Sequence, residues 1–363
     1  MYLDRTSASP HSPRPPPRPP TPSPSSPRCD IFSYGSGGKV GCSPEPSGFP
    51  LTLVANRYKT LRMVGQGRFG KVFVAKDLQH SSANQVKLVA VKYDYSGLNL
   101  LKHEATMLNF LHQRCPPKER AGFNLPKVLW FGVVESVPAL VMNHFNGGTF
   151  AWWVKQHGPF SPHEVVTVAQ SLLGTLKSIH QLAVIHRDLK PENLVFDDQG
   201  RLMVIDFGLS VFYLDGATGR HVPKTAEPLK CLVGSPLYVS IHTHLGVRNA
   251  RRDDCLQVGY ILLYMMLQGQ LPWEKDYYFA LESERSGANG GMCNTLLQDA
   301  DLLSIGSPLN RLLYMHKTRI KCNDPIWTDY MERCTALDYD QEPDYVYVPY
   351  DPVDGHNDTK KPT

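Results

Sequence analysis

The spacing of hydrophobic and polar positions divides the chain into a strand-rich first part and a helix-rich second part. In the first part, short apolar runs are bounded by glycine or polar residues, as is typical of strands. One segment, Asn99–Gln113, instead repeats its apolar residues at helical spacing and predicts a helix. The strands are predicted at residues 58–64, 71–75, 85–93, 125–134 and 138–142.

A helical pattern begins at Ser161. This residue is placed to cap a helix over 161–183, with Pro162 at the first helical position and Glu164 completing a capping box. Together the two parts predict an α+β fold with two lobes: a small, mostly β N-terminal lobe with one helix and a larger, mostly α C-terminal lobe. Further helices are predicted at about 253–268, 295–304 and 326–337.

The segment HRDLKPEN at 186–193 is followed by the tripeptide DFG at 206–208. Between them, two apolar runs flank the turn-forming stretch 197–200, which is typical of a β-hairpin. The hairpin brings Asn193, before its first strand, close to Asp206, after its second. An amide oxygen and a carboxylate at one end of a hairpin suit a hard cation such as Mg²⁺, which also takes ligands from phosphates. The pattern therefore predicts phosphoryl transfer.

Two residues within HRDLKPEN have side chains suited to catalysis. Asp188 is the candidate base that accepts the proton of an incoming hydroxyl, and Lys190 is placed to contact the transferred phosphate. Taken singly, an aspartate or asparagine in a loop is usually a turn former. The combination of these residues with DFG in one register favours catalysis.

A glycine-rich stretch and a lysine–glutamate pair complete the candidate nucleotide site. Gly65–Gly70 has the pattern GxGxxG between two predicted strands, which favours a flap over nucleotide phosphates. Glu104 lies in the apolar stripe of its helix, where a carboxylate needs a partner. We expect an ion pair with Lys92 that directs the ammonium toward the α- and β-phosphates. The structural alternatives are an ordinary hairpin turn, a surface lysine and a glutamate that reaches water.

The two ends of the chain differ in composition from the rest. Residues 1–50 are dense in Pro, Ser, Gly and Arg, and they are predicted to be a disordered tail because they contain too little apolar surface to fold. Within them, Arg14–Pro20 matches a ligand of Src-homology-3 modules, although prolines at this density also produce such spacings in a plain solvated tail. Residues 350–363 form a second, polar tail.

The composition of the whole chain narrows its class. A chain of 363 residues that is 42% hydrophobic can bury a substantial core, and a formal net charge of +4 is too small to indicate nucleic-acid binding. The longest apolar run, Val258–Leu267, is about half the length of a membrane span and predicts a buried helix. The eight cysteines form no close pairs, which favours reduced intracellular thiols over a zinc site or disulfides. We expect an intracellular protein, cytoplasmic or nuclear or both.

These motifs together resemble eukaryotic protein kinases over about residues 57–345, with an N-lobe at 57–142 and a C-lobe at 146–345. Within the kinases, the chain is most similar to the casein kinase I group, which the segments GSPLYVSIHTHLG (234–246) and DYMERCTALDYDQEPDYVY (329–347) resemble. The resemblance implies the bilobal protein-kinase fold, with ATP and Mg²⁺ as cofactors. It also implies transfer of the γ-phosphate of ATP to serine or threonine of protein substrates.

The resemblance further implies roles for individual residues. Asp254, in the motif RRDD, would anchor the backbone of the catalytic loop, and Met142 would be the gatekeeper before a hinge at Asn143–Phe145. His242 and His244 fall in the substrate-binding segment, which favours packing over metal binding. The implied site comprises the catalytic residues Asp188, Lys190 and Asn193, the metal ligands Asn193 and Asp206, and an ATP-binding set of Val64, Gly65, Gln66, Gly67, Arg68, Phe69, Gly70, Val72, Ala90, Lys92, Glu104, Met142, Asn143 and Phe145.

The chain departs from the casein kinase I pattern in two places. Leu237 stands directly before the tyrosine of the docking segment, where that group has a basic residue. Lys230 and Ser235 are then the candidate contacts for substrate or anion, and acidic protein substrates are the class that the resemblance implies. A Gly/Ser-rich piece at 283–291 predicts a surface insertion.

Two other functions use the same fold. A nucleotide-binding pseudokinase could act as a scaffold through its proline-rich tail, but such proteins usually lack a catalytic residue and none is missing here. A kinase of small molecules or lipids is disfavoured by residues 230–246, which resemble a peptide-docking segment. We expect a monomer that binds ATP and protein substrates, with no direct nucleic-acid contact and no membrane span.

Overall fold

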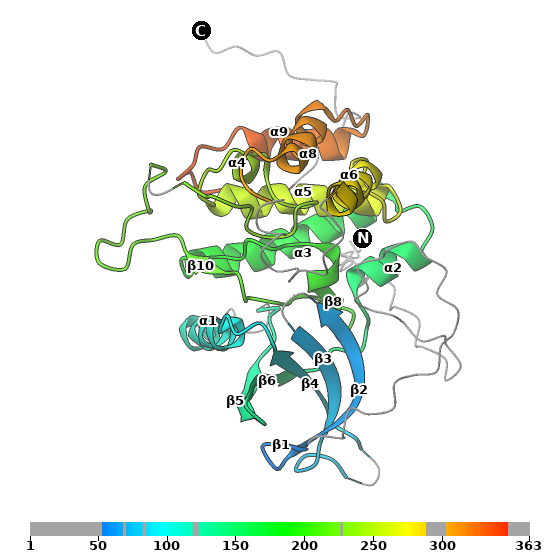
Figure 1. Ribbon diagram of the computed structural model, residues 1–363, viewed down its shortest axis with the longest axis vertical. Coiled ribbons are helices and arrows are strands. Elements are labelled where there is room, and N and C mark those ends of the chain that lie inside the picture. The colour runs from blue at the N-terminus through cyan, green and yellow to red at the C-terminus, as the bar shows by residue number, and fades with distance from the viewer. Residues whose placement is uncertain are drawn as a thin grey trace, which may run out of the picture.

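The computed structural model describes residues 53–67, 70–82, 85–118, 123–225, 228–287 and 303–347. Within them the chain forms a strand-rich lobe and a larger helical lobe, at opposite ends of the view in Figure 1. The two-lobed α+β fold predicted from the sequence is therefore confirmed. The expected tails at 1–50 and 350–363, and two residues of the glycine-rich loop, Arg68 and Phe69, lie outside the described residues.

The N-terminal lobe contains a six-stranded sheet in the order β1-β2-β3-β4-β6-β5, with antiparallel neighbours throughout. Alternate residues of β4, Val89, Val91 and Tyr93, are buried in a small apolar cluster of this lobe. Helix α1 (Leu100–Arg114) contacts β4, β5 and β6. The strands are β1 (Leu53–Val54), β2 (Tyr58–Gly67), β3 (Gly70–Asp77), β4 (Leu88–Asp94), β5 (Val128–Val134) and β6 (Val137–Asn143).

The C-terminal lobe is built around α5 (Arg251–Met266), in which apolar and polar residues alike are buried. Helices α3 (Pro162–Gln181) and α9 (Pro325–Thr335) both contact α5. The predicted capping box is present, because Glu164 N donates to Ser161 Oγ at 3.3 Å and Ser161 N donates to Glu164 Oε2 at 2.8 Å. The other helices described here are α2 (Phe150–Gln156), α4 (Ile241–His244), α6 (Glu274–Gly287) and α8 (Pro308–Arg319).

Short strands connect the helical lobe to the catalytic segments. Strands β8 (Leu194–Phe196) and β9 (Leu202–Val204) pair antiparallel, with Leu194 opposite Val204, so the predicted hairpin is confirmed. Its turn is closed by Asp197, whose Oδ1 accepts from the N–H groups of Gln199 and Arg201, both at 2.9 Å. Strand β7 (Val184–Ile185) pairs with β10 (Val211–Phe212), and a 3₁₀ turn spans Pro191–Asn193.

The structure differs from the predicted elements in the second half of the chain. The helix predicted at 295–304 lies mainly outside the described residues, and Leu303 and Ser304 are not helical. Instead, Ser304 forms an isolated β-bridge with Cys231, a long-range pairing that local propensity cannot reveal. In the predicted surface insertion at 283–291, residues 283–287 form the end of α6, and 288–291 lie outside the described residues, so the insertion stays a prediction. No helix among the described residues is both long and apolar enough to cross a bilayer.

Candidate active site

The catalytic loop runs from β7 to β8 and is anchored by a buried carboxylate of α5. Asp254 Oδ2 accepts from His186 N at 2.7 Å, and its Oδ1 accepts from Arg187 N at 2.9 Å. His180 Nε2 lies 2.9 Å from the same Oδ2. Burial opposes ionisation of Asp254, but the hydrogen bond from His180 and these neighbouring groups lower its pKa. The anchor holds Arg187 at φ +70°, a left-handed conformation that costs energy in a non-glycine residue.

Gln257, on the same helix, provides a second anchor. Its Oε1 accepts from Leu189 N at 3.0 Å and its Nε2 donates to Arg187 O at 3.0 Å. This residue is not among the predicted site residues. The available signal was a polar side chain inside the apolar part of a helix, and such a side chain needs hydrogen-bond partners when it is buried.

Asp188 is held on both oxygens of its carboxylate. Ser235 N donates to Oδ1 at 2.7 Å. Lys190 Nζ donates to Oδ2 at 3.0 Å, and Asn193 Nδ2 donates to the same oxygen at 3.1 Å. The structure thus brings the three predicted catalytic residues together. Asp188 has a relative exposure of 7%, and these hydrogen bonds fix the orientation of its carboxylate, as a positioned proton acceptor requires.

A partly buried lysine joins the two lobes. Lys92 Nζ on β4 donates to Glu104 Oε2 on α1 at 2.9 Å and to Asp206 Oδ1 at 2.9 Å. The ion pair expected between Lys92 and Glu104 is therefore present, and Asp206 shares the ammonium. Burial disfavours the charged lysine, yet the two carboxylates raise its pKa above the usual value. Burial raises the pKa of Glu104, and the charge of Lys92 opposes that rise.

Asn193 and Asp206 flank one end of the β8–β9 hairpin. Their proximity follows from the backbone bond between Ile205 N and Asn193 O, at 2.9 Å. The amide nitrogen of Asn193 donates to Asp188, so the amide oxygen of Asn193 points away from Asp188. Although burial opposes its ionisation, Lys92 lowers the pKa of Asp206 to about 2, so the carboxylate is charged at neutral pH, and its side chain is 38% exposed. One amide oxygen and one charged, accessible carboxylate fit a hard divalent cation.

The DFG segment is oriented by its phenylalanine. Phe207 is fully buried and meets the ring of His186 edge to face, with centroids 4.8 Å apart. The preceding Asp206 adopts φ +66°, in the left-handed region. Burial of the apolar ring holds this strained backbone in place, and the strained backbone directs the Asp206 carboxylate toward Lys92.

The residues of the predicted nucleotide site lie on the glycine-rich hairpin and on the strands beside it. In the β2–β3 hairpin, Gly65 lies opposite Val72 and Gly67 opposite Gly70. A β-carbon at Gly70 would lie 1.8 Å from Tyr93 O, so only glycine allows β3 to approach β4 this closely. The other residues of the predicted ATP set lie on the same elements: Val64 on β2, Ala90 on β4 directly opposite Met142 on β6, then Asn143 at the end of β6 and Phe145 just beyond it.

The predicted docking segment lies directly against the catalytic loop. Ser235 Oγ accepts from Lys190 Nζ at 2.7 Å. Gly234 has φ +100°, and a β-carbon there would lie 2.4 Å from Arg187 O. Leu237 is 91% buried and its carbonyl accepts from Trp273 Nε1 at 3.0 Å. Lys230, in contrast, is exposed, and its carbonyl accepts from the Ile305 N–H at 2.8 Å.

The two histidines with HxH spacing are parts of the helical lobe's packing. His244 is buried, and its Nδ1 lies 2.6 Å from Asn310 Oδ1. Burial lowers the pKa of His242 to about 4, and the charges of Arg252 and Lys224 lower it further in the same direction. Across the described residues, no three His, Cys, Asp or Glu side chains are grouped to hold a metal ion.

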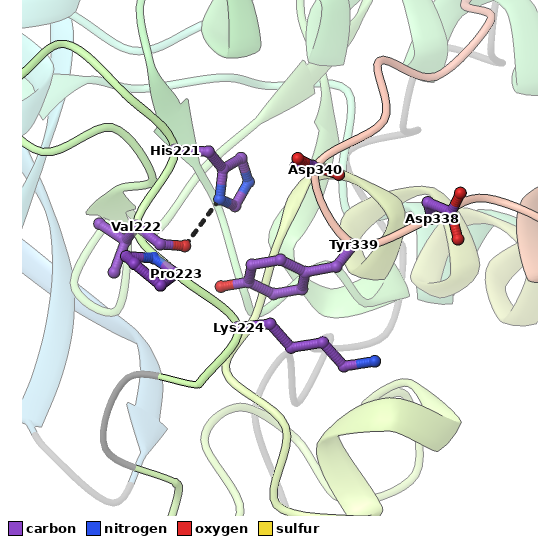
Figure 2. Close-up of a pocket in the computed structure, with 7 residues that line it drawn as sticks. All are labelled: His221, Val222, Pro223, Lys224, Asp338, Tyr339 and Asp340. Atoms are coloured by element: carbon purple, nitrogen blue, oxygen red, sulfur yellow. Dashed lines mark hydrogen bonds between the residues drawn. The ribbon is translucent and has the colours of Figure 1, made fainter.

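A separate hollow of about 310 Å³ lies between residues 221–224 and the C-terminal residues 338–340 (Figure 2). Figure 2 shows the hydroxyl end of Tyr339 directed toward Val222 and Pro223. The ring of His221 meets Tyr339 edge to face, with centroids 4.7 Å apart. None of the residues that line this hollow belongs to the predicted nucleotide site, so the hollow reflects the packing of the C-terminal segment.

Comparison with known proteins places the geometry in a family. A solved structure described as vaccinia related kinase 3 superposes with a TM-score of 0.59 at 19% sequence identity, covering 84% of this chain and 88% of that one. At that identity the likeness shows the fold alone. The family model for the protein kinase domain matches residues 58–287. Because this match spans more than half of the sequence, the chain belongs to the protein kinase family, whose members use ATP and a divalent metal ion to phosphorylate proteins.

Proposed function

We propose that the chain is a serine/threonine protein kinase of the casein kinase I type, with a kinase domain at about 57–345. The observation that carries the proposal is the convergence of two hydrogen-bonded groups on the end of the β8–β9 hairpin. One group is the Lys92 ammonium with its two carboxylates, and the other is Asp188 with Lys190 and Ser235. The charged groups of Lys92, Asp188 and Lys190 each have a hydrogen-bond partner that fixes their position.

The catalytic step follows from these positions. Asp188 accepts the proton of the substrate hydroxyl. The hydroxyl oxygen of the substrate forms a bond to the γ-phosphorus of ATP, and the bond between that phosphorus and the β,γ-bridging oxygen breaks. Lys190 neutralises charge on the transferred group, and Lys92 holds the α- and β-phosphates. Asn193 and Asp206 would hold Mg²⁺, which supplies further charge neutralisation when it is bound. ADP leaves, and Asp188 returns its proton to solvent.

Preference for serine or threonine is supported by one contact. Lys190 Nζ bridges Asp188 Oδ2, at 3.0 Å, and Ser235 Oγ, at 2.7 Å. This bridge ties the docking segment to the base, and a lysine at position 190 is the pattern of serine/threonine kinases. Assignment to the casein kinase I type depends on the motifs at 234–246 and 329–347, and Leu237 makes an exposed residue such as Lys230 the candidate contact for acidic substrates.

Phosphate transfer to casein tests the proposal. We expect the purified full chain, with Mg²⁺ and γ-labelled ATP, to label serine and threonine of casein. Substitution Asp188→Asn should lower kcat by about 10²–10⁴-fold, because it removes the proton acceptor and keeps the shape of the side chain. The matched control is Asp198→Asn, at an exposed aspartate in the nearby hairpin, and it should leave kcat unchanged.

Three other results would contradict parts of the proposal. Label found only on tyrosine would remove the serine/threonine assignment. Thermal stabilisation by Mg²⁺-ATP without turnover would favour a nucleotide-binding scaffold. Equal kcat in the Asp188→Asn variant and the wild type would remove the role given to that residue. The Src-homology-3 partner, the monomeric state and the intracellular location stay predictions.

A further inference from the structure

Lys317, on α8, is buried without an acidic partner. Its relative exposure is 5%. Within the described residues, no carboxylate lies within ion-pair distance of its Nζ. Lysine is seldom buried unless it is paired, because removing an ammonium from water is energetically unfavourable. Other contacts must therefore replace the water around this ammonium.

The replacement contacts come from the docking segment and the helices beside it. Lys317 Nζ donates to Pro236 O at 2.9 Å and to Val239 O at 2.6 Å. It lies 3.0 Å from His244 Nε2. The rings of Tyr260 and Trp273 face the ammonium as well, with Nζ 5.0 and 5.6 Å from their centroids, within the range of cation–π attraction.

Burial lowers the pKa of Lys317 well below its usual value, but the hydrogen-bond network has room for three donors at Nζ and so indicates a charged Lys317 beside a neutral His244. Asn310 Nδ2 donates to His244 O at 2.9 Å, so the Asn310 amide oxygen faces His244 Nδ1 at 2.6 Å. Nδ1 must then carry the proton, which leaves Nε2 as an acceptor for the third N–H of Lys317. All three ammonium donors are thereby used. Burial lowers the pKa of His244, and the charge of Lys317 lowers it further, in agreement with a neutral ring.

The carbonyls that follow Ser235 depend on side chains from outside the segment. Ser235 O is satisfied locally, by Tyr238 N at 2.8 Å and Val239 N at 3.0 Å. The carbonyls of Pro236 and Val239 are satisfied by Lys317, and that of Leu237 by Trp273. Leaving a buried carbonyl without a partner is energetically unfavourable, so these donors stabilise the path of the segment.

We propose that Lys317 is the positioning residue that holds the docking segment 235–239 against the catalytic loop and so sets the binding of the protein substrate. The inference rests on the proposed kinase function. Ser235 transmits the effect, because its N–H and hydroxyl contact Asp188 and Lys190 directly. The printed partners of Lys317 Nζ do not include the predicted nucleotide residues Lys92, Glu104 or Asp206, which bond to one another.

Steady-state kinetics of the full chain test this role. Lys317→Met keeps most of the side-chain volume and removes the charge and the three donors. We expect kcat/KM for casein to fall about tenfold or more, the equivalent of one or two lost charge-assisted hydrogen bonds. The KM for ATP should stay within about twofold of wild type, since the Lys92 site is separate. The matched control is Arg319→Met, which removes an exposed cation from the same helix.

A second variant and a second measurement keep the test decisive. Lys317→Gln retains two N–H donors without the charge and should give a smaller loss than Lys317→Met. Hydrogen exchange should speed up at the amides of 235–239 in both variants and stay unchanged in β4. If Lys317→Met folds poorly, Lys317→Gln alone can show the fall in casein kcat/KM and the faster hydrogen exchange.

The possible outcomes separate this inference from the proposed function. A casein kcat/KM in the Lys317 variants equal to that of Arg319→Met overturns the inference, and so does a parallel rise in the KM for ATP. If the wild type phosphorylates nothing, the proposed function fails. Hydrogen exchange then tests only the claim that Lys317 holds the docking segment, and unchanged exchange at 235–239 in the Lys317 variants overturns that claim.

Discussion

Two buried ionised side chains hold the two backbone segments of the active site, and they carry opposite charges. Asp254, on α5, accepts hydrogen bonds from the N–H groups of His186 and Arg187. Lys317, on α8, donates to the C=O groups of Pro236 and Val239. The negative charge serves the segment with unpaired N–H groups, and the positive charge serves the segment with unpaired C=O groups. The comparison shows that irregular segments can be fixed by one central ion each, where a sheet or helix would use regular backbone bonds.

The two anchors differ in how completely the surrounding protein supports them. Asp254 has the flanking hydrogen bond of His180 and the nearby Gln257, which binds the same loop. Lys317 relies on His244 and two aromatic rings. Asp254 therefore belongs to the larger hydrogen-bond network, and loss of its charge should affect folding more than loss of the lysine. Three substitutions follow in order of expected effect: the first tests this difference directly, the second tests the contact between the two anchored segments, and the third tests a partly buried histidine on α4.

Asp254→Asn should cause the largest effect. The amide has the same shape, but its NH₂ group would face a backbone N–H, leaving one buried donor unpaired. We expect the free energy of unfolding to fall by about 3–5 kcal/mol, together with most of the kinase activity. Urea denaturation measures the former. The exposed Asp276 on α6, substituted in the same way, is the control and should change stability by less than about 0.5 kcal/mol. A smaller effect for Asp254→Asn than for Lys317→Met would reverse the comparison.

Gly234→Ala should give an intermediate effect, because Gly234 lies where the two anchored segments meet. Its φ of +100° disfavours any side chain, and a β-carbon would lie 2.4 Å from Arg187 O. We expect a loss of about 1–3 kcal/mol in unfolding free energy and a clear fall in casein turnover. Gly174→Ala in α3 is the control, since a β-carbon there meets nothing within 4 Å and alanine favours a helix. Equal stability of the two variants would show that the segments do not meet as described.

His242→Gln should give the smallest effect, visible as a change in pH dependence. The pKa of His242 is lowered to about 4 in the folded protein, mainly by burial, whereas an unfolded histidine titrates near 6.5. Between these values the unfolded chain binds more protons, so wild-type stability is lost as the pH falls from about 6.5 to about 4. Because the variant lacks this titration, its free energy of unfolding should fall by about 1 kcal/mol less than that of the wild type over this pH range, after allowance for the partial exposure of the ring. Denaturation at pH 7 and pH 5 measures the difference, with His163→Gln, at an exposed position, as the control.

Much of the site follows from local pattern. The hairpin that joins Asn193 to Asp206 was predictable because strand–turn–strand patterns act over a few residues, and the capping box at Ser161 was predictable for the same reason. The pairing of Lys92 with Glu104 could be inferred because a carboxylate in an apolar helix stripe requires a partner. Asp254 was found through resemblance to a family motif, while Gln257 and Lys317 were missed, since a polar residue in a helix does not identify its distant partner.

The sequence by itself determined the two-lobed order of strands and helices, the hairpin and the chemistry of the predicted catalytic residues, because these depend on short-range spacing and residue type. Only the tertiary structure decided that Ser304 pairs with Cys231, that Lys92 is shared by two carboxylates, and that Lys317 satisfies carbonyls some 80 residues away in the chain. The physical reason is that a buried polar group takes whichever partner the packing of distant elements places within hydrogen-bond distance, and local sequence contains no record of that packing.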